Sequence, residues 1–397
     1  MKRLLFITHR MPYPPDKGER VRAFHELQAL AQHFEITLAS LAYEASDLES
    51  AQMLRCWCSQ VLLVGRSAWA GRLRAGLSLL TGRAASEGYF ASRSLAQAIA
   101  RSGKGQPFDV VLGYCSSMLP YALRAPARQR LIDLVDVDSA KWAAYAGQSS
   151  GLRKWLYGRE ARLVARLERQ SVRECRAVFL VSQNEIDALG IRSERLIALP
   201  NGVDTEFFSP QAPSDPPSAE IVFTGSMDYR PNVEAVCWFA RSVLPAVRKR
   251  VGGASFWIVG RNPTRAVQRL AEEVPAVHVT GAVPDVRPFL ARAQIAVAPL
   301  HIARGIQNKV LEAMAMGKPV IVSPQAAEGI EAAPDVELLL ARTVQEWEDQ
   351  VVLLLGSSGR CAELGALARQ CVRERYSWPA RMAPLVDLCL RLAEEPA

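Results

Sequence analysis

Short apolar runs alternate with segments of helical periodicity along the whole chain. The first cycle consists of an apolar run at 4–8, a loop rich in proline and glycine at 11–18, and apolar residues at helical spacing over 21–32. This order predicts a buried strand, a loop and a helix. Further strand candidates in the first half are the apolar runs at 36–41, 61–64, 109–113, 131–135 and 177–181. Helical stretches separate these runs, and repetition of this kind predicts a parallel sheet that helices cover on both faces.

The same pattern starts again near residue 220. The strand candidates of the second half are 221–225, 256–260, 277–281, 295–298 and 319–322. Before them come Pro-Asn-Gly-Val-Asp at 200–204 and a stretch containing proline and serine at 211–219. Residues of these types favour turns and open connections, so they indicate a hinge and a linker between two halves.

The length of the chain and the position of the linker set the expected domain organisation. At 397 residues the chain exceeds what one hydrophobic core usually supports. We expect two α/β, Rossmann-like domains: an N-terminal domain at 1–199 and a C-terminal domain at 220–376, joined by a linker at 200–219. A last helix within 377–397 is expected to cross back to the N-terminal domain.

Composition narrows the class of protein. Lys and Arg exceed Asp and Glu by 48 to 40, and the net charge of +8 favours anionic partners such as phosphates, acidic lipids or nucleic acid. Of the eight cysteines only Cys56 and Cys58 lie close together, and their spacing fits neither a redox pair nor a zinc pair. The first residues lack a signal-peptide cleavage site, and no run of about 18 uncharged apolar residues occurs. We therefore expect a cytoplasmic protein with reduced thiols.

Three strand candidates in the second half end in a glycine: Gly225, Gly260 and Gly281. A glycine at this place lets a phosphate or a sugar approach the backbone, while the next helix presents free N–H groups and the positive end of its dipole. The alternative for each glycine is an ordinary tight turn. The three glycines are therefore candidate ligand contacts.

The segment 298–321 has the most specific chemistry, because it reads as strand, polar loop, helix, glycine and next strand. In the loop, Gly305 and Ile306 can offer backbone N–H groups. Arg304 and Lys309 add positive charge on either side of them. This combination predicts a site for a diphosphate.

Glu312 lies in the helix of this segment, among valine, leucine, alanine and methionine. A carboxylate in apolar surroundings needs a partner, because its desolvation is otherwise costly. A ribose diol would satisfy it, and so would an ion pair with Lys309 three residues earlier. The sequence leaves both partners open.

A family resemblance rests on Lys-Val-Leu-Glu-Ala-Met-Ala-Met-Gly-Lys-Pro-Val at 309–320 and on Asn-Gly-Val-Asp at 201–204. These motifs resemble the donor-binding half of the retaining GT-B glycosyltransferases of family 4, and the resemblance covers essentially the whole chain. It implies two Rossmann-like domains that face each other across a cleft, with the nucleotide-sugar on the C-terminal domain and the acceptor on the N-terminal domain. It also implies that Glu312 holds the ribose, that the anomeric configuration is retained, and that no metal or other cofactor is needed.

The sequence departs from that family's pattern in two places. Arg304 stands where the family has the first glutamate of its Glu-x7-Glu motif. Ser226 and Pro231 stand where the family has a basic pair after the first strand of the donor domain. We therefore expect Arg230, Arg304 and Lys309 to supply the positive charge for the diphosphate.

A narrower resemblance comes from Asp-Val-Asp-Ser at 136–139, Gly-Ser-Met-Asp-Tyr at 225–229 and Gly-Ile-Gln-Asn-Lys at 305–309. Together these motifs resemble bacterial glycosyltransferases associated with exosortase A and PEP-CTERM sorting systems and with their exopolysaccharide clusters. This resemblance implies a role in exopolysaccharide biosynthesis.

Two features of the first half are candidates for ligand contacts. His9 lies at the end of the first predicted strand, and the loop that follows contains Gly18, where the backbone can approach the donor phosphate or the acceptor. Arg20 or Arg22 can contact anionic groups. The alternative is an ordinary loop between a strand and a helix.

Asp133, Asp136 and Asp138 cluster where another predicted strand ends. Ser139 is the expected cap of a helix that begins at Lys141. The Asp-x-Asp spacing is typical of metal-dependent GT-A transferases, but the nucleotide motif lies in the other half of the chain. We therefore expect no metal here and a carboxylate, Asp136 or Asp138, that orients an acceptor hydroxyl; helix capping is the alternative.

Two segments combine positive charge with apolar residues at helical spacing. Residues 66–83 contain four arginines and no acidic residue, and residues 151–176 contain eight Lys or Arg against three Glu. Both compositions suit helices that lie on acidic lipid headgroups. A solvated helix face over a packed core explains them equally well.

The sequence thus predicts a glycosyltransferase that moves a sugar from a UDP- or GDP-sugar to a glycan or a lipid-linked glycan, with an anionic membrane surface as a further partner. The expected catalytic side chains are those of His9, Asp136, Asp138, Arg304 and Lys309. A nucleotide-sugar 2-epimerase shares this architecture and is the enzymatic alternative. A non-catalytic nucleic-acid binder would explain only the net charge, since no basic patch with interleaved aromatic residues and no known binding module occurs, so we expect no nucleic acid as a partner.

Overall fold

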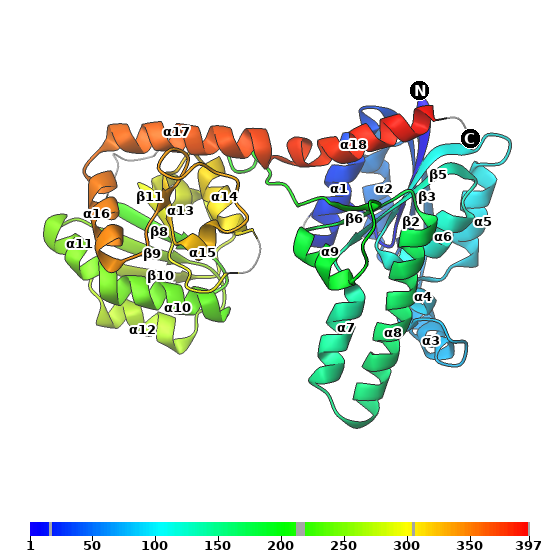
Figure 1. Cartoon of the computed structure of the whole chain (residues 1–397), viewed down its shortest axis with the longest axis horizontal. Helices are drawn as coiled ribbons and strands as arrows, with labels where there is room; N and C mark the ends of the chain where they lie inside the picture. Colours follow the sequence, from blue (N-terminus) through cyan, green and yellow to red (C-terminus); the bar gives the residue numbers. More distant parts are fainter. Residues whose placement is uncertain (16–17, 212–218, 304–305, 396–397) are drawn as a thin grey trace. The chain divides into compact units, whose positions relative to one another are not determined.

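The computed structural model describes residues 1–15, 18–211, 219–303 and 306–395. The chain divides into two compact units (Figure 1). Unit 1 comprises Met1–Asn201 together with the residues from Arg381 onward, and unit 2 comprises Gly202–Ala380. Each unit contains one parallel sheet and the helices that connect its strands.

The sheet of unit 1 has the strand order β3-β2-β1-β4-β5-β6-β7, and its pairs are parallel. Its strands are β1 (Lys2–Thr8), β2 (Phe34–Ala42), β3 (Gln60–Gly65), β4 (Phe108–Tyr114), β5 (Ala127–Val135), β6 (Ala177–Leu180) and β7 (Leu196–Ala198). The first six coincide with the predicted apolar runs. The seventh is not predicted, because three residues are too few to form a recognisable pattern.

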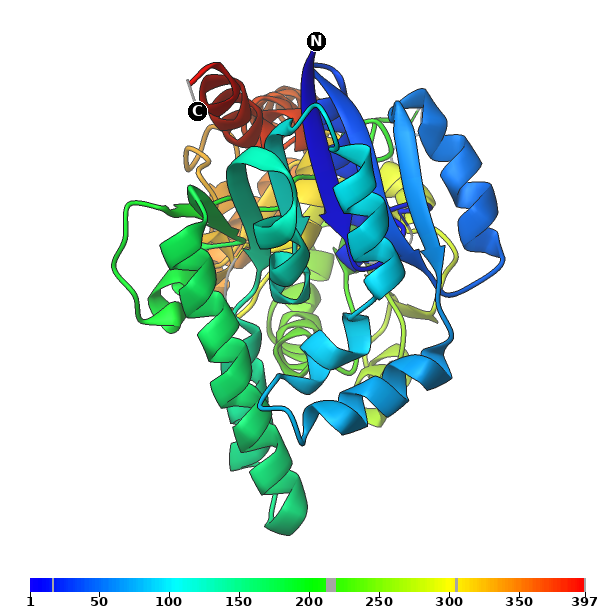
Figure 2. The same cartoon turned by 90° about the vertical axis from the view of Figure 1, so that its right-hand side faces the viewer.

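Helices connect these strands, and one pair of them stands out from the unit. The helices are α1 (Gly18–Ala31), α2 (Ser46–Met53), η1 (Leu54–Cys56), α3 (Ala68–Ser78), α4 (Ala85–Phe90), α5 (Arg93–Ser102), η2 (Ser116–Met118), α6 (Leu119–Arg124), α7 (Asp138–Gly147), α8 (Gly151–Glu174) and α9 (Gln183–Leu189). Consecutive helices α7 and α8 pack on each other and project from the rest of unit 1 (Figure 2). The α1 and α8 ranges follow the predicted helical patterns.

The sheet of unit 2 has the strand order β10-β9-β8-β11-β12-β13. Its strands are β8 (Glu220–Thr224), β9 (Ser255–Val259), β10 (Val277–Gly281), β11 (Ile295–Ala298), β12 (Val320–Val322) and β13 (Leu339–Leu340). Five of them match the predicted strands. The two-residue β13 is not predicted, for the same reason as β7.

The helices of unit 2 bury a shared apolar core against this sheet. They are α10 (Arg230–Trp238), η3 (Phe239–Val243), α11 (Leu244–Arg250), α12 (Arg265–Glu273), α13 (Arg287–Arg292), α14 (Asn308–Ala315), α15 (Pro324–Ala327), α16 (Val344–Leu355) and α17 (Ser358–Arg375). Phe223, Phe239, Phe256 and Trp347 are fully or almost fully buried at the centre of this core. The last helix, α18 (Trp378–Glu394), begins in unit 2, and its residues from Arg381 onward belong to unit 1.

Both sheets reverse their strand order next to the first strand. In unit 1, β1 lies between β2 and β4, and in unit 2, β8 lies between β9 and β11. At such a point the connections from the two neighbouring strands leave toward opposite faces of the sheet, so a crevice opens at their carboxyl ends. Ligands of open α/β sheets bind in this crevice, which directs attention to the segments after β1, β4, β8 and β11.

Within the described part of the chain, no single helix is long and apolar enough to cross a bilayer; α16 and α17 reach that length and apolarity only as a pair bent by 104°.

Candidate functional site

The crevice of unit 2 brings together two segments that the sequence separates by about 80 residues. Gly225 follows β8, and α14 follows β11, the strand that pairs with β8. Lys309 is the second residue of α14, so its side chain starts from the first turn of the helix. Because a helix begins with free N–H groups, this end of α14 favours anions.

Lys309 is held against the turn that follows β8. Its Nζ donates a hydrogen bond of 2.5 Å to Oδ1 of Asn232, and it lies 4.6 Å from the centre of the Phe223 ring. A methyl group added to Gly225 would lie 3.4 Å from that Nζ, which places the ammonium directly beside the glycine. Burial lowers the pKa of Lys309 to about 8, and the carboxylate of Glu312 partly opposes this shift. The ammonium is therefore poorly hydrated, which strengthens its attraction for an anion.

Glu312 lies about one turn further along α14 and is half-buried. Burial raises its pKa, and the charge of Lys309 acts in the opposite direction. The hydrogen bond of Lys309 goes to Asn232 and not to Glu312, although the two charges attract each other. A carboxylate in this position can accept hydrogen bonds from the two hydroxyls of a diol.

Asn232 is a site residue that the sequence did not reveal. It is buried in the first turn of α10, and its Nδ2 donates a 2.8 Å hydrogen bond to the carbonyl of Ser226 while its Oδ1 accepts from Lys309. Asn232 therefore joins α14 to the loop after β8. An asparagine just after the start of a helix has many ordinary roles, so its type and position alone gave no signal.

The loops after β8 and β9 support each other. Oγ of Ser226 donates to Asp228 at 2.7 Å, and Nδ2 of Asn262 donates to the same carboxylate at 3.0 Å. These two hydrogen bonds hold the pKa of Asp228 below its usual range. Nε of Arg261 lies 3.4 Å from Oγ of Ser226, so this arginine, which no sequence motif marks, adds positive charge beside the loop.

The three strand-end glycines have different surroundings. A methyl group on Gly260 would lie 1.6 Å from the carbonyl oxygen of Gly225, so glycine is required there for the two loops to touch. Gly225 lies beside Lys309, as described above. Gly281 ends β10 at the edge of the sheet, two strands from β8, and has a positive φ of 71° with open space beside it. Of the three, Gly225 is the one next to the charged groups.

The remaining predicted donor contacts are Arg230, Arg304, Gly305 and Ile306. Arg230 begins α10, but its side chain is 85% exposed and pairs with Glu234 on the same helix at 2.7 Å. Ile306 is half-buried, two residues before the start of α14. Arg304 and Gly305 lie outside the described residues.

In unit 1, His9 follows β1 at the other crevice. Its Nδ1 lies 3.4 Å from Sγ of Cys115, which follows β4, and its ring stacks against Tyr114 with 6.1 Å between ring centres. Burial and the neighbouring Arg10 lower the pKa of His9 to about 4. The imidazole is therefore neutral at pH 7. Gly18 is the first residue of α1, at the same end of the sheet.

Asp136 and Asp138 share one lysine. Nζ of Lys141 lies 2.7 Å from a carboxylate oxygen of Asp136 and 3.5 Å from one of Asp138. Burial raises the pKa of Asp138, and Lys141 opposes that shift. Among the described residues, no group of three or more His, Cys, Asp or Glu side chains is arranged to hold a metal ion.

Two expectations for this region are wrong. The helix α7 begins at Asp138 and not at Lys141, and Ser139 does not cap it: its hydroxyl donates to Glu168 on α8 at 2.5 Å. Asp133 does not join the other two aspartates, because it is fully buried and pairs with Arg22 at 2.6 Å.

Arg22 is likewise not a surface contact for anions. It is buried against Asp133, with Glu26 at 3.2 Å, and it donates to the carbonyl of Leu199 and to Asn201. Burial and the adjacent Asp133 raise the pKa of Glu26 well above its usual range. This buried group ties α1 to β5 and to the last residues of the first segment of unit 1, which is a structural role.

Comparisons with known proteins give a family for part of the chain and a fold for all of it. Residues 218–357 match the family described as Glycosyl transferases group 1. Over 212 residues the chain is 31% identical to the GDP-mannose-dependent alpha-(1-6)-phosphatidylinositol monomannoside mannosyltransferase of Mycobacterium tuberculosis, covering 48% of this chain and 54% of that protein. The chain thus spans about half the length of this relative.

Solved structures resemble the whole chain. Sucrose-phosphate synthase from Thermosynechococcus elongatus has a TM-score of 0.58 at 15% identity, covering 98% of this chain and 99% of that one. Anabaena Alr3699/HepE in complex with UDP has a TM-score of 0.59 at 14% identity, covering 98% and 100%. The two parallel-sheet, Rossmann-like units match GT-B glycosyltransferase structures, and the predicted fold class is confirmed.

Proposed function

We propose that the chain is a retaining glycosyltransferase that transfers a sugar from a UDP- or GDP-sugar to a hydroxyl of a glycan or lipid-linked glycan. The observation that carries this proposal is the pair Lys309 and Glu312 on α14, placed beside Gly225 in the crevice of unit 2. The family match covers this segment. A relative named for its use of GDP-mannose and a solved neighbour in complex with UDP support a nucleotide-sugar donor.

Each side chain has a definite task in this reaction. Glu312 accepts hydrogen bonds from the ribose hydroxyls of the donor. The bond between the sugar C1 and the diphosphate oxygen breaks, a bond from C1 to the acceptor oxygen forms on the same face, and the hydroxyl proton passes to the leaving diphosphate. Lys309 and the first N–H groups of α14 stabilise the negative charge that develops on the diphosphate.

Unit 1 is proposed to hold the acceptor. We propose that its neutral His9 and the pair Asp136 and Asp138 accept hydrogen bonds from a sugar hydroxyl. We further propose a role in bacterial exopolysaccharide biosynthesis, on the inner face of the cytoplasmic membrane; this part rests on the sequence resemblance alone.

A product analysis tests the function. The chain is incubated with radiolabelled UDP- and GDP-sugars, with and without lipid-linked glycan extracted from membranes. We expect label to enter the lipid fraction only when the acceptor is present. Release of a free, 2-epimerised sugar without any acceptor would reject the transferase in favour of a nucleotide-sugar 2-epimerase.

We expect this transfer to continue in EDTA. Lys309 and helix N–H groups are proposed to stabilise the negative charge of the leaving diphosphate, so no cation is needed for it. Asp136 and Asp138 already pair with Lys141. The initial rate with EDTA should therefore equal the rate without it. A complete loss of rate that manganese or magnesium restores would contradict the metal-free proposal.

The exposed apolar side of α3 supports docking on an acidic membrane. This helix packs on α4 through small residues, since a methyl on Gly71 would meet Tyr89 and one on Gly88 would meet Ser78. Its other side leaves large apolar side chains exposed, namely Trp69, Leu73 and Leu77, and Leu80 just beyond the helix is 85% exposed. Leu152 and Trp155 are exposed at the start of α8 in the same way. These exposed side chains do not lie over a packed core, whereas Val164 and Val172 further along α8 are buried.

We expect the protein to sediment with acidic liposomes at low salt and to be released as salt rises. Each basic residue near an acidic surface contributes about 1 kcal/mol before screening. Replacing Arg162 and Arg166, both exposed on α8, with glutamate should lower the bound fraction without changing nucleotide binding. Equal binding to neutral and acidic liposomes, or binding to neither, would contradict this docking.

A further inference from the structure

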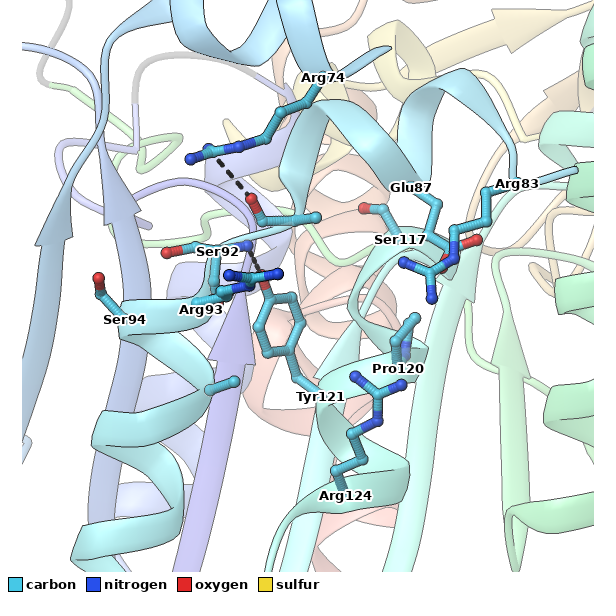
Figure 3. A pocket seen from close by; sticks show the side chains of 12 residues that line it. Arg74, Arg83, Glu87, Ser92, Arg93, Ser94, Ser117, Pro120, Tyr121 and Arg124 are labelled. Carbon is cyan, nitrogen blue, oxygen red and sulfur yellow. Dashed lines mark hydrogen bonds and ion pairs between the residues drawn. The ribbon is translucent and has the colours of Figure 1, made fainter. Parts of the chain in front are cut away.

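Four arginines line one pocket of unit 1 that has no part in the chemistry described so far. The pocket has a volume of about 640 Å³ and lies among α3, α4, α5, η2 and α6 (Figure 3). Arg74 comes from α3, Arg83 from the loop after it, Arg93 from α5 and Arg124 from α6. Glu87 is the single carboxylate among the described lining residues.

The positive charge of this pocket is not neutralised by its own walls. Nε of Arg83 lies 3.8 Å from Glu87, and Arg74 donates to the backbone carbonyl of Ala91 at 3.3 Å. One carboxylate thus faces four guanidinium groups. In the view of Figure 3, Arg83 and Arg124 lie on the side of Glu87 and Ser117, and Arg74 and Arg93 lie on the side of Tyr121. Guanidinium groups gathered in this way favour a bound anion.

The arginine charges act on the pKa values of two lining residues, Tyr121 and Glu87. Burial raises the pKa of Tyr121, while Arg66, Arg74 and Arg124 act in the opposite direction. Burial also raises the pKa of Glu87, against the attraction of Arg83 and Arg124. The hydroxyl of Tyr121 is fixed at 2.6 Å from the N–H of Ser92 and donates to the carbonyl of Phe90 at 2.8 Å, so the wall at this place is ordered.

Helix α8 holds α3 and α4 in place, the two helices that carry Arg74 and Glu87. A guanidinium nitrogen of Arg159 donates to the carbonyl of Ser78 at 2.9 Å. The Glu160 carboxylate accepts from the N–H of Ala85 at 2.6 Å and from the hydroxyl of Ser86 at 2.7 Å. Arg159 and Glu160 are both buried. The pocket is therefore preformed by contacts that do not involve its own arginines.

We propose that this pocket binds the phosphate or diphosphate of the acceptor, and that this group links the accepting sugar to a lipid. The inference rests on the proposed transferase function and adds the chemical class of the acceptor. Arginine is the side chain best matched to phosphate, because its planar fork donates two parallel hydrogen bonds. The volume exceeds what a single phosphate fills, and Leu77 and Leu80 lie exposed between Arg74 and Arg83 in the chain. The helix that contributes Arg74 to the pocket therefore also exposes apolar surface for a lipid chain.

Titration calorimetry with three soluble probes tests the pocket: inorganic pyrophosphate, geranyl diphosphate and glucose 1-phosphate. The key variant is R83A combined with R124A, and its charge-retaining partner is R83K combined with R124K. The matched control is R55A combined with R101A, which removes two exposed arginines of unit 1 outside the pocket. The variant K309A reports binding at the nucleotide crevice of unit 2.

We expect geranyl diphosphate to bind the wild type and K309A alike, and to bind R83A/R124A about 100-fold more weakly, as two lost charge-assisted hydrogen bonds imply. The lysine variant should fall between them, and the R55A/R101A control should bind like the wild type. Tighter binding of geranyl diphosphate than of pyrophosphate, reduced by L77S/L80S, would support the lipid source. Glucose 1-phosphate could instead bind as tightly as geranyl diphosphate, in a way that depends on Arg83 and Arg124. That result would overturn the lipid link and leave a soluble sugar phosphate as the acceptor.

Two results would overturn the proposed phosphate site: geranyl diphosphate binds R83A/R124A as tightly as it binds the wild type, or its binding is lost only in K309A. The outcome is separable from that of the proposed function. Arginine-dependent binding without any sugar transfer would leave the pocket standing and reject the transferase. Sugar transfer with an acceptor KM that R83A/R124A leaves unchanged would reject the pocket alone.

Discussion

Replacing Lys309 with methionine should lower kcat/KM for the donor by about 100-fold to 1,000-fold, the usual effect of removing one group that stabilises developing negative charge. The lysine lies beside Gly225 and is held there by Asn232, so no other described side chain is placed to take over its position. Steady-state kinetics with saturating acceptor measures this loss. The control is Lys249→Met, on an exposed lysine of α11, which should leave kcat/KM unchanged.

The same lysine should give the reaction a pH dependence. Its pKa is lowered to about 8, so the ammonium is present below that pH and is lost as the pH rises through it. Because kcat/KM reports the free enzyme, it should fall above about pH 8. Lys309→Arg should remove this fall, since guanidinium stays charged. A profile that is flat to pH 10 in the wild type, or a full rate in Lys309→Met, would contradict the role of Lys309.

Glu312→Gln should weaken donor binding by about 10-fold to 100-fold, since a charge-assisted hydrogen bond contributes about 1.5–3 kcal/mol. Burial already raises the pKa of Glu312, so the neutral amide removes a half-buried charge and the thermal unfolding midpoint should not fall. Calorimetric titration with UDP and GDP measures the affinity. Affinity in the wild type should also fall as the pH drops through the raised pKa, because the protonated acid is a poorer acceptor.

A matched variant separates this effect from a general loss of charge. Glu348 is, like Glu312, a half-buried glutamate of a helix, α16, and Glu348→Gln should bind both nucleotides like the wild type. Unchanged affinity and turnover in Glu312→Gln would reject the ribose contact and return Glu312 to the alternative of an ordinary helix carboxylate attracted by Lys309.

The fold was predictable because parallel strands buried on both faces are continuous apolar runs. Each predicted run forms a strand in the structure, and the described strands that were not predicted are the very short β7 and β13. The strand order was not predictable from these runs, because it depends on which strands pair. That order places the segments after β8 and β11 side by side, and it explains why two distant motifs form one site.

The candidate site was only partly predictable. Glu312 was predictable as a site residue because an unpartnered carboxylate is costly in an apolar helix. Lys309 was predictable because it places a positive charge beside the polar loop that precedes this helix. Asn232 and Asn262 could not be found, since Asn232 bonds to the distant Lys309, Asn262 bonds to Asp228 on another loop, and amides have many ordinary roles. Arg22 was misjudged because its partner Asp133 lies 111 residues away. The arginine pocket collects residues from several elements between 74 and 124, and no spacing in the sequence marks it.

A crystal structure of the chain with UDP or GDP bound tests the central claim most directly. We expect the diphosphate within hydrogen-bonding distance of Nζ of Lys309 and of the first N–H groups of α14. We expect both ribose hydroxyls on the carboxylate of Glu312, with Gly225 in contact with the nucleotide. A nucleotide held elsewhere, with Lys309 still bonded only to Asn232 and Glu312 free of the ribose, would contradict it.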